Sequence, residues 1–238
     1  MVFDVGNTLF HLDYAFIADA LAAAGHAVDP MALRIAEYEA KAAVDRALLA
    51  RAPDAAAIHL WRNDAIRRPS YFTTVLGAVG IPPAVAGDLL DALEAHNRER
   101  CLWRVMEPDT PAVLDALRAR GYVLAVVSNA DGRVEADLAR AGLAPRFATI
   151  VDSHVVGVEK PARRIFELAL ERLDVPADAA LYVGDLFGID VVGARGAGMS
   201  AVLVDPLARY PVPEECLRIR RLGELLDLVP PAAANARP

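Results

Sequence analysis

Cysteines and long hydrophobic runs are scarce in this sequence, and their scarcity excludes several kinds of protein. Only Cys101 and Cys216 occur among 238 residues, which is too few for a small disulfide-stabilised secreted domain. The apolar runs are too short to span a bilayer. The chain opens on an apolar strand pattern, without the charged and apolar regions of a signal peptide. We therefore expect a cytoplasmic protein that does not insert into membranes.

Positive charge is also in short supply. The sequence has 25 Lys and Arg residues against 32 Asp and Glu residues, a formal net charge of −7. A binder of nucleic acid or of an anionic membrane surface needs clustered basic residues, so we expect neither partner. A phosphorylated small molecule is still compatible with this charge, because a bound cation can supply positive charge locally. The sequence is compatible with a monomer or a homodimer.

Apolar residues make up 55% of the chain, which is enough for a substantial core. Between residues 14 and 100 they recur with helical periodicity, and no convincing strand interrupts them, so we predict a small helical bundle. The helices predicted there are residues 14–24, 30–49, 55–67, 69–79 and 82–100.

From Thr110 onward, strand patterns alternate with helical patterns. The strands predicted at residues 122–127, 147–151, 179–183 and 201–204 are almost continuously apolar, which is typical of a parallel sheet buried on both faces. The short strand at the start of the chain must join this sheet, because it cannot be stable alone. The predicted fold class is therefore α/β, a Rossmann-like parallel sheet covered by helices on both faces, with an inserted α-helical bundle. The expected parts are a core of residues 1–13 and 101–229, an insert of residues 14–100 and a frayed tail of residues 230–238.

The first strand delivers a carboxylate to its C-terminal end. Asp4 follows the β-forming Val2 and Phe3, and the turn-forming Gly6-Asn7-Thr8 comes soon after it. Ligands of open α/β sheets bind beyond the carboxyl ends of the strands, where an aspartate can act as a nucleophile. The structural alternative is an aspartate that only caps a turn.

Polar groups also follow the later strands. Ser128 and Asn129 end one apolar run, Asp185 follows another, and Lys160 precedes a proline that can begin a helix. A hydroxyl can hold a phosphate oxygen, a lysine can offset its charge, and Asp185 with Asp190 suits Mg²⁺, which takes few protein carboxylates. Taken singly, each has a plainer explanation: a helix-entry turn, a solvated lysine and an N-cap at Asp190.

Together and in this order, these stretches resemble the four motifs of the haloacid dehalogenase-like hydrolase superfamily. FDVGNTL resembles the first motif, SNA the second, Lys160-Pro161 the third and GDLFGID the fourth. The resemblance covers nearly the whole chain. It is to the group with a helical cap inserted after the first motif, which implies that residues 14–100 are the cap.

The resemblance implies a Mg²⁺-dependent phosphatase that acts on a small phosphorylated metabolite. The ion would be held by Asp4, by the backbone carbonyl of Gly6 and by Asp185, with Asp190 in support.

The resemblance also implies a role for each polar group around that ion. Asp4 would attack the substrate and form an aspartyl-phosphate. Ser128 would hold a phosphoryl oxygen, and Lys160 would orient Asp4 and offset negative charge. Thr8 and Asn129 would join them in binding the substrate. Such a site is physically sound, because phosphoryl transfer depends mostly on positioning and electrostatic stabilisation.

The first motif departs from the phosphatase pattern at Gly6. Family phosphatases usually read D-x-D-G-T, and the second aspartate of that motif, the general acid/base, is Gly6 here. A positioned acid/base is worth roughly 10²–10⁴ in rate. The enzyme would then favour good leaving groups, use His11 or Asp13 instead, or bind phosphorylated ligands without efficient turnover. For His11 and Asp13, the plainer interpretation is a pair of solvated flanking residues.

Two other function classes stay open. Family members that break carbon–halogen bonds also lack the second aspartate, but they usually carry a bulky residue at the Gly6 position and a Ser/Asn-type fourth motif. The acidic pair Asp185 and Asp190 favours a metal and phosphoryl chemistry instead. The non-enzymatic alternative is a sensor or assembly partner that binds a phosphorylated ligand.

Substrate selection is expected in the cap, which contains an unusual polar and aromatic group. This group is His59, Trp61, Arg62, Arg67, Arg68 and Tyr71. The two aromatic residues are more typical of a bundle core with a polar tip, and the arginines of a solvated face. An arginine facing the site would recognise a substrate carboxylate or a second phosphate.

Overall fold

The computed structural model of the chain describes residues 1–49 and 71–231. Contacts between its Cα atoms divide the chain into two compact units. Unit 1 comprises residues 1–10, 106–208 and 212–238, and unit 2 comprises residues 11–105 and 209–211. The predicted insert, residues 14–100, falls within the longer segment of unit 2.

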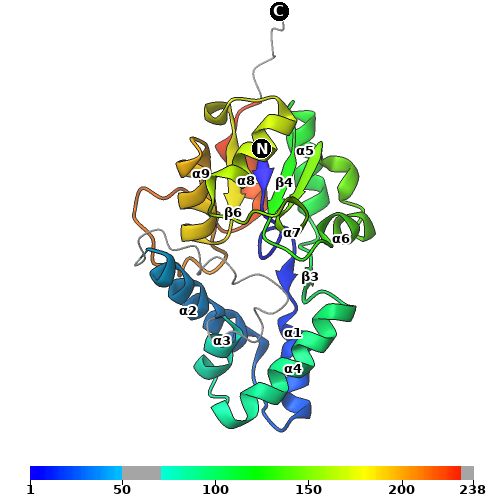
Figure 1. Ribbon diagram of the computed structural model, residues 1–238, viewed down its shortest axis with the longest axis vertical. Helices are drawn as coiled ribbons and strands as arrows, with labels where there is room; N and C mark the ends of the chain where they lie inside the picture. The colour runs from blue at the N-terminus through cyan, green and yellow to red at the C-terminus, as the bar shows by residue number, and fades with distance from the viewer. Residues whose placement is uncertain (50–70, 232–238) are drawn as a thin grey trace, which may run out of the picture. The chain divides into compact units, whose positions relative to one another are not determined.

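Unit 1 (Figure 1) is built on a six-stranded parallel sheet with the strand order β5-β4-β1-β6-β7-β8. The strands are β1 (Val2–Phe3), β4 (Ala125–Ser128), β5 (Thr149–Asp152), β6 (Leu181–Gly184), β7 (Ser200–Val204) and β8 (Arg218–Ile219). The side chains of β1 and β4 are fully buried, because strands sandwiched between helical layers have no solvent-facing side. The opening strand lies in the middle of the sheet, between β4 and β6.

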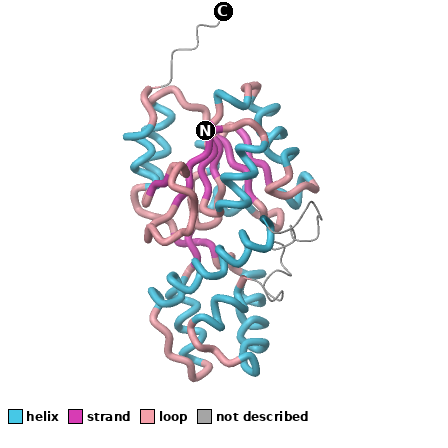
Figure 2. Tube along the Cα trace, turned by 90° about the vertical axis from the view of Figure 1, so that its left-hand side faces the viewer, coloured by secondary structure: helices cyan, strands magenta, loops and turns pink. Residues whose placement is uncertain are grey.

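Helices lie on both faces of this sheet, as Figure 2 shows, which confirms the predicted α/β class. They are α5 (Thr110–Ala119), α6 (Val134–Arg140), α7 (Ser153–Val156), α8 (Arg163–Leu173), α9 (Val192–Gly196) and α10 (Leu225–Leu228). The longest of them, α8, buries Ile165, Phe166 and Ala169 and packs against β4 and β5. Its Arg163 and Arg164 face solvent, so the helix covers the sheet with one apolar stripe.

The differences from the sequence prediction concern short elements. The strand predicted at 122–127 is β4, which begins at Ala125. A π-helical turn that is not predicted, η5 (Phe187–Val191), precedes α9. The strand β8 and the helices α7 and α10 are not predicted from the sequence. Elements of two to four residues are too short to show a periodicity.

Unit 2 contains four described helices and a two-stranded sheet. They are α1 (Tyr14–Ala23), α2 (Pro30–Leu49), α3 (Phe72–Ala78), α4 (Pro83–Glu99), and the antiparallel strands β2 (His11–Leu12) and β3 (Trp103–Val105). The helix bounds agree with the predicted helices within three residues, except that the helix predicted at 55–67 lies outside the described residues. The two strands flank the helical block in the sequence and were not predicted.

Of the polar and aromatic group expected in the cap, only Tyr71 lies within the described residues. It is buried, its hydroxyl donates to Glu37, and its ring packs against Phe72 and Trp103. The prediction of a core aromatic residue with a polar tip is therefore confirmed for Tyr71. Residues His59, Trp61, Arg62, Arg67 and Arg68 lie outside the described part of the chain.

Within residues 1–49 and 71–231, none of the helices combines the length and the hydropathy needed to cross a bilayer.

Candidate active site

The sheet topology of unit 1 gathers residues from distant parts of the sequence at one edge. The strands β4, β1 and β6 are neighbours and run parallel, so their carboxyl ends meet. Ser128 is the last residue of β4, Asp4 follows β1, and Asp185 follows β6. The backbone amide of Asp4 donates to the carbonyl of Val183, at 2.9 Å, and extends the β1–β6 pairing to the carboxylate.

The loop after Asp4 is a tight turn. The carbonyl oxygen of Val5 accepts from the amides of Leu9 and Phe10, each at 2.9 Å, and Asn7 adopts a left-handed φ of 51°. Thr8 is buried in this loop, and its hydroxyl has no hydrogen-bond partner within the described residues. A buried hydroxyl without a partner in the loop that follows the Asp4 carboxylate is suited to a ligand oxygen.

The side chain of Lys160 contacts three other residues of the site. Its side chain is 2% exposed, and its ammonium donates to Asp4 Oδ1 at 2.7 Å, Asp190 Oδ1 at 2.7 Å and Tyr182 Oη at 2.9 Å. Burial opposes the charged amine, but the charges of Asp190 and Asp4 outweigh burial and raise the pKa of Lys160. The lysine is therefore an ammonium, and not the solvated lysine of the plainer explanation.

The carboxyl group of Asp4 is under opposing influences. Burial raises its pKa, and this effect exceeds the opposing attraction of Lys160, while the nearby charge of Asp190 raises it further. Two buried acids close together repel each other unless enough positive charge is at hand. A single lysine only partly supplies it, so the site favours an additional cation.

Asn129 braces the backbone of Lys160. Its Oδ1 accepts from the amide of Lys160 at 2.7 Å, and its Nδ2 donates to the carbonyl of Lys160 at 2.9 Å. The second motif thus fixes the third motif in place. The structure brings Asn129 and Ser128 to the same edge of the sheet, but it gives the Asn129 amide a positioning role that the sequence did not predict.

Asp190 is held over the end of β6 by its own loop. Its Oδ2 accepts from the amides of Asp185 at 3.0 Å and Leu186 at 2.9 Å, while Oδ1 faces Lys160. Asp190 lies inside η5, and the residue at the N-cap position of that turn is Leu186, so the N-cap explanation for Asp190 is wrong. A Cβ atom at Gly184 would lie 2.4 Å from the Asp190 carboxyl carbon. Glycine is therefore required at position 184.

Three buried carboxylates meet in a group that could hold a metal ion. Asp4, Asp185 and Asp190 each offer one oxygen, and these oxygens lie within 4.8 Å of one another. Oxygen donors and concentrated negative charge suit Mg²⁺. Because both oxygens of Asp190 already accept hydrogen bonds, Asp4 and Asp185 fit the role of direct ligands and Asp190 that of support. The predicted backbone ligand, Gly6, lies two residues after Asp4 in the same loop.

The two candidates for a substitute acid/base lie in unit 2. Asp13 Oδ1 accepts from the amide of Phe16 at 2.9 Å, which caps α1, and its Oδ2 faces Arg104 Nη2 at 2.7 Å. His11 is part of β2 and pairs with Val105. Asp13 therefore has a structural role as a helix cap and ion-pair partner, and is not the solvated flanking residue of the plainer interpretation.

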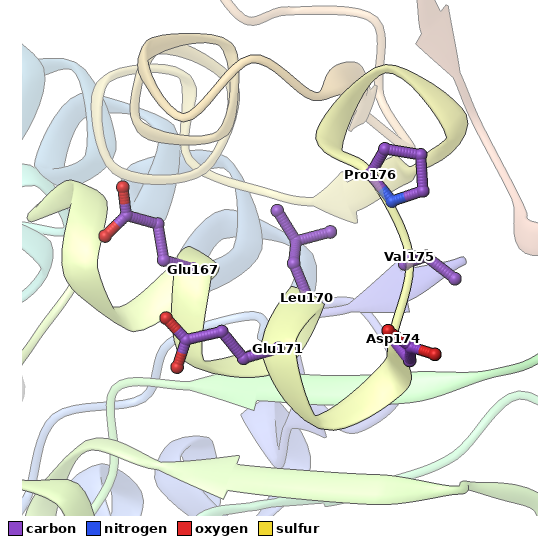
Figure 3. Close-up of a pocket in the computed structure, with 6 residues that line it drawn as sticks. All are labelled: Glu167, Leu170, Glu171, Asp174, Val175 and Pro176. Carbon is purple, nitrogen blue, oxygen red and sulfur yellow. The ribbon is translucent and has the colours of Figure 1, made fainter.

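A separate hollow of about 410 Å³ lies along the C-terminal half of α8 (Figure 3). It is lined by Glu167, Leu170, Glu171, Asp174, Val175 and Pro176. These residues lead into the start of β6, at the edge of the sheet opposite to Asp4 and Asp185. Its carboxylates would repel a phosphorylated ligand, so this hollow is not the candidate active site.

Comparison with known proteins identifies the class. A family model described as a haloacid dehalogenase-like hydrolase matches residues 1–198. The chain therefore belongs to the haloacid dehalogenase-like hydrolase family.

Individual relatives include both phosphatases and a dehalogenase. A glyceraldehyde 3-phosphate phosphatase of Methanothermobacter thermautotrophicus is 39% identical over 49% of this chain and 51% of its own length. A protein with the same name from Methanopyrus kandleri is 34% identical over 68% of this chain and 72% of its own. The structure of a 2-haloacid dehalogenase from Pseudomonas syringae is 27% identical, with a TM-score of 0.55 over 95% of this chain and 96% of the other. The chain spans about half the length of the first relative.

Proposed function

We propose that this protein is a Mg²⁺-dependent phosphatase that hydrolyses a small phosphorylated metabolite through an aspartyl-phosphate on Asp4. The observation that carries the proposal is the buried group of Asp4, Asp185 and Asp190, whose oxygens lie within 4.8 Å of one another beside Lys160. The names of two relatives, both glyceraldehyde 3-phosphate phosphatases, favour the same reaction and a substrate of similar size.

The proposed reaction begins with attack of the Asp4 carboxylate on phosphorus. Lys160 holds Asp4 Oδ1 at 2.7 Å and thereby limits the rotation of the nucleophile. Ser128 and Thr8 would bind phosphoryl oxygens, Thr8 with the buried hydroxyl that has no partner in the described residues. A bound Mg²⁺ would offset the negative charge shared by the carboxylates and the phosphoryl group. The P–O bond to the leaving group breaks, and its oxygen keeps the bonding electron pair.

The missing acid at Gly6 shapes both half-reactions. The leaving oxygen must take its proton from solvent, so substrates with good leaving groups should react faster. In the second step a water molecule attacks phosphorus, which releases inorganic phosphate and regenerates Asp4. Without a positioned base this step is slow, and the aspartyl-phosphate should be long-lived.

We propose that unit 2 acts as the cap that selects the substrate and excludes water, as closing segments of enzymes do. The two cysteines and the short apolar runs favour action in the cytoplasm. The protein would act as a monomer or a homodimer.

The test is a panel of phosphomonoesters and 2-haloacids, assayed with Mg²⁺ and with EDTA, beside the Asp4→Asn variant. We expect phosphatase turnover that EDTA abolishes, that Mg²⁺ restores and that Asp4→Asn lacks. Haloacid turnover that survives EDTA would instead show a dehalogenase. Mg²⁺-dependent binding of a phosphorylated ligand, with no turnover above Asp4→Asn, would show a sensor.

A further inference from the structure

Tyr182 lies in β6, and its hydroxyl contacts Lys160 in the candidate active site. The side chain is fully buried, Oη accepts from Lys160 Nζ at 2.9 Å, and Oη donates to the carbonyl of Val127 at 2.9 Å. Val127 belongs to β4, on the other side of β1 from β6. The tyrosine therefore spans the central strand and links the two neighbours of the nucleophile's strand.

The hydroxyl completes the surroundings of the Lys160 ammonium. An ammonium carries three N–H donors and no acceptor. Two of these donors point to Asp4 Oδ1 and Asp190 Oδ1, and Tyr182 Oη accepts the third. Because the hydroxyl proton is committed to the Val127 carbonyl, Oη must present a lone pair to the lysine. A lysine with three fixed acceptors cannot turn toward a different arrangement without leaving a buried donor unpaired.

The tyrosine ring is itself fixed by its neighbours. It packs edge-on against Phe166 of α8, with ring centroids 5.2 Å apart and an interplanar angle of 73°. Phe166 is fully buried, and a Cβ atom at Gly193 would lie 2.9 Å from its ring, so α9 packs closely against the opposite partner of this aromatic contact. The ring contact supports the tyrosine, while the hydrogen bond from its hydroxyl to the Val127 carbonyl fixes the acceptor for Lys160.

We infer that Tyr182 is a positioning residue: its hydroxyl holds the Lys160 ammonium, and through it the Asp4 carboxylate, in the orientation for attack. This inference rests on the proposed function for its kinetic part. Loss of the hydroxyl removes one acceptor from Lys160 and no group that contacts the substrate. The effect should therefore fall on kcat and leave KM nearly unchanged, since positioning acts on the chemical step.

The kinetic test compares Tyr182→Phe with two controls under saturating Mg²⁺. We expect Tyr182→Phe to lower kcat by about tenfold with KM within about twofold of the parent. Phe166→Leu removes the ring contact but keeps the hydroxyl, and should change kcat far less. Tyr122→Phe removes a hydroxyl that donates to the Pro230 carbonyl, and should change nothing. An unchanged kcat in Tyr182→Phe, or an equal loss in Phe166→Leu, would overturn the inference.

A second readout needs neither turnover nor metal. In the metal-free parent, a fixed and buried ammonium should give a slowly exchanging ¹H–¹⁵N resonance, assigned to Lys160 by its absence in Lys160→Met. We expect that resonance to broaden or disappear in Tyr182→Phe and to persist in Tyr122→Phe. A parent without a protected resonance would overturn the inference, even if Tyr182→Phe did not fold. The two failures are separable, because an inactive parent that keeps this resonance refutes the phosphatase and not the role of Tyr182.

Discussion

Each unit of this protein buries a lysine beside carboxylates and tyrosines, and the two arrangements differ in charge balance. In unit 1, Lys160 contacts Asp4 and Asp190, with Asp185 close by. In unit 2, Lys41 Nζ lies 3.8 Å from Oε2 of Glu37, and Glu37 precedes Lys41 by one turn of α2. The Glu37 carboxylate also receives the hydroxyls of Tyr14 and Tyr71.

The difference separates a functional arrangement from a structural one. In unit 2 the Glu37 carboxylate faces Lys41 and accepts from two neutral tyrosine hydroxyls. The Lys41 ammonium also lies 5.4 Å from the centre of the Tyr38 ring, a favourable cation–π distance. In unit 1 one lysine contacts two aspartates, and a third aspartate lies in the same buried group. A buried excess of negative charge is costly unless a cation binds nearby, so this imbalance supports the proposed metal site.

Removing each lysine in turn should separate the two arrangements most clearly. Lys160→Met leaves Asp4 and Asp190 without their shared cation, so we expect kcat to fall by about 10²-fold or more. Lys41→Met should keep kcat within a few fold and lower the free energy of unfolding by about 2 kcal/mol. Steady-state kinetics and urea unfolding of both variants provide the measurements. If only Lys41→Met lost turnover, the functional arrangement would be that of unit 2 and not that of unit 1.

Restoring the missing acid should sharpen the picture of unit 1. The backbone at Gly6 does not have the positive φ of glycines such as Gly132, so an aspartate can adopt its conformation. We expect Gly6→Asp to raise turnover of alkyl phosphates by roughly 10²-fold. The gain should be smaller for aryl phosphates, whose leaving groups need less protonation. If the purified variant is no faster than the parent across the panel, the missing-acid argument is wrong.

The smallest effect is expected at the balanced arrangement of unit 2. In Glu37→Gln an amide NH₂ replaces one of the oxygens that accept tyrosine hydroxyls. We expect a loss of about 1 kcal/mol in the free energy of unfolding. The exposed neighbour Glu39 offers a matched control, since Glu39→Gln should leave urea unfolding unchanged. Equal losses of unfolding free energy in Glu37→Gln and Glu39→Gln would show that the buried position of Glu37 does not add to stability.

The fold and the gathering of Asp4, Ser128, Lys160 and Asp185 could be predicted because each residue follows or precedes a recognisable element. Parallel strands then bring these positions to one edge, whatever their separation in the sequence. The position of Asp190 in the same site could be predicted from the order of the four motifs.

Tyr182 and the brace formed by Asn129 could not be predicted in this way. Within the apolar run that forms β6, a tyrosine has the same signature as any core aromatic residue, and only the structure shows its hydroxyl beside Lys160. The Asn129 amide satisfies a backbone 31 residues away, a pairing that no local pattern records. The strands β2, β3 and β8 were missed because two or three residues carry no periodicity.

Gly184 has no functional group of its own, but its lack of a side chain is needed for the arrangement of the site. The Asp190 carboxyl carbon occupies the space that a side chain at position 184 would need. A larger residue there would displace Asp190, and this displacement would pass to Lys160 and then to Asp4. The orientation of Asp4, the proposed nucleophile, therefore depends on the absence of a side chain at position 184.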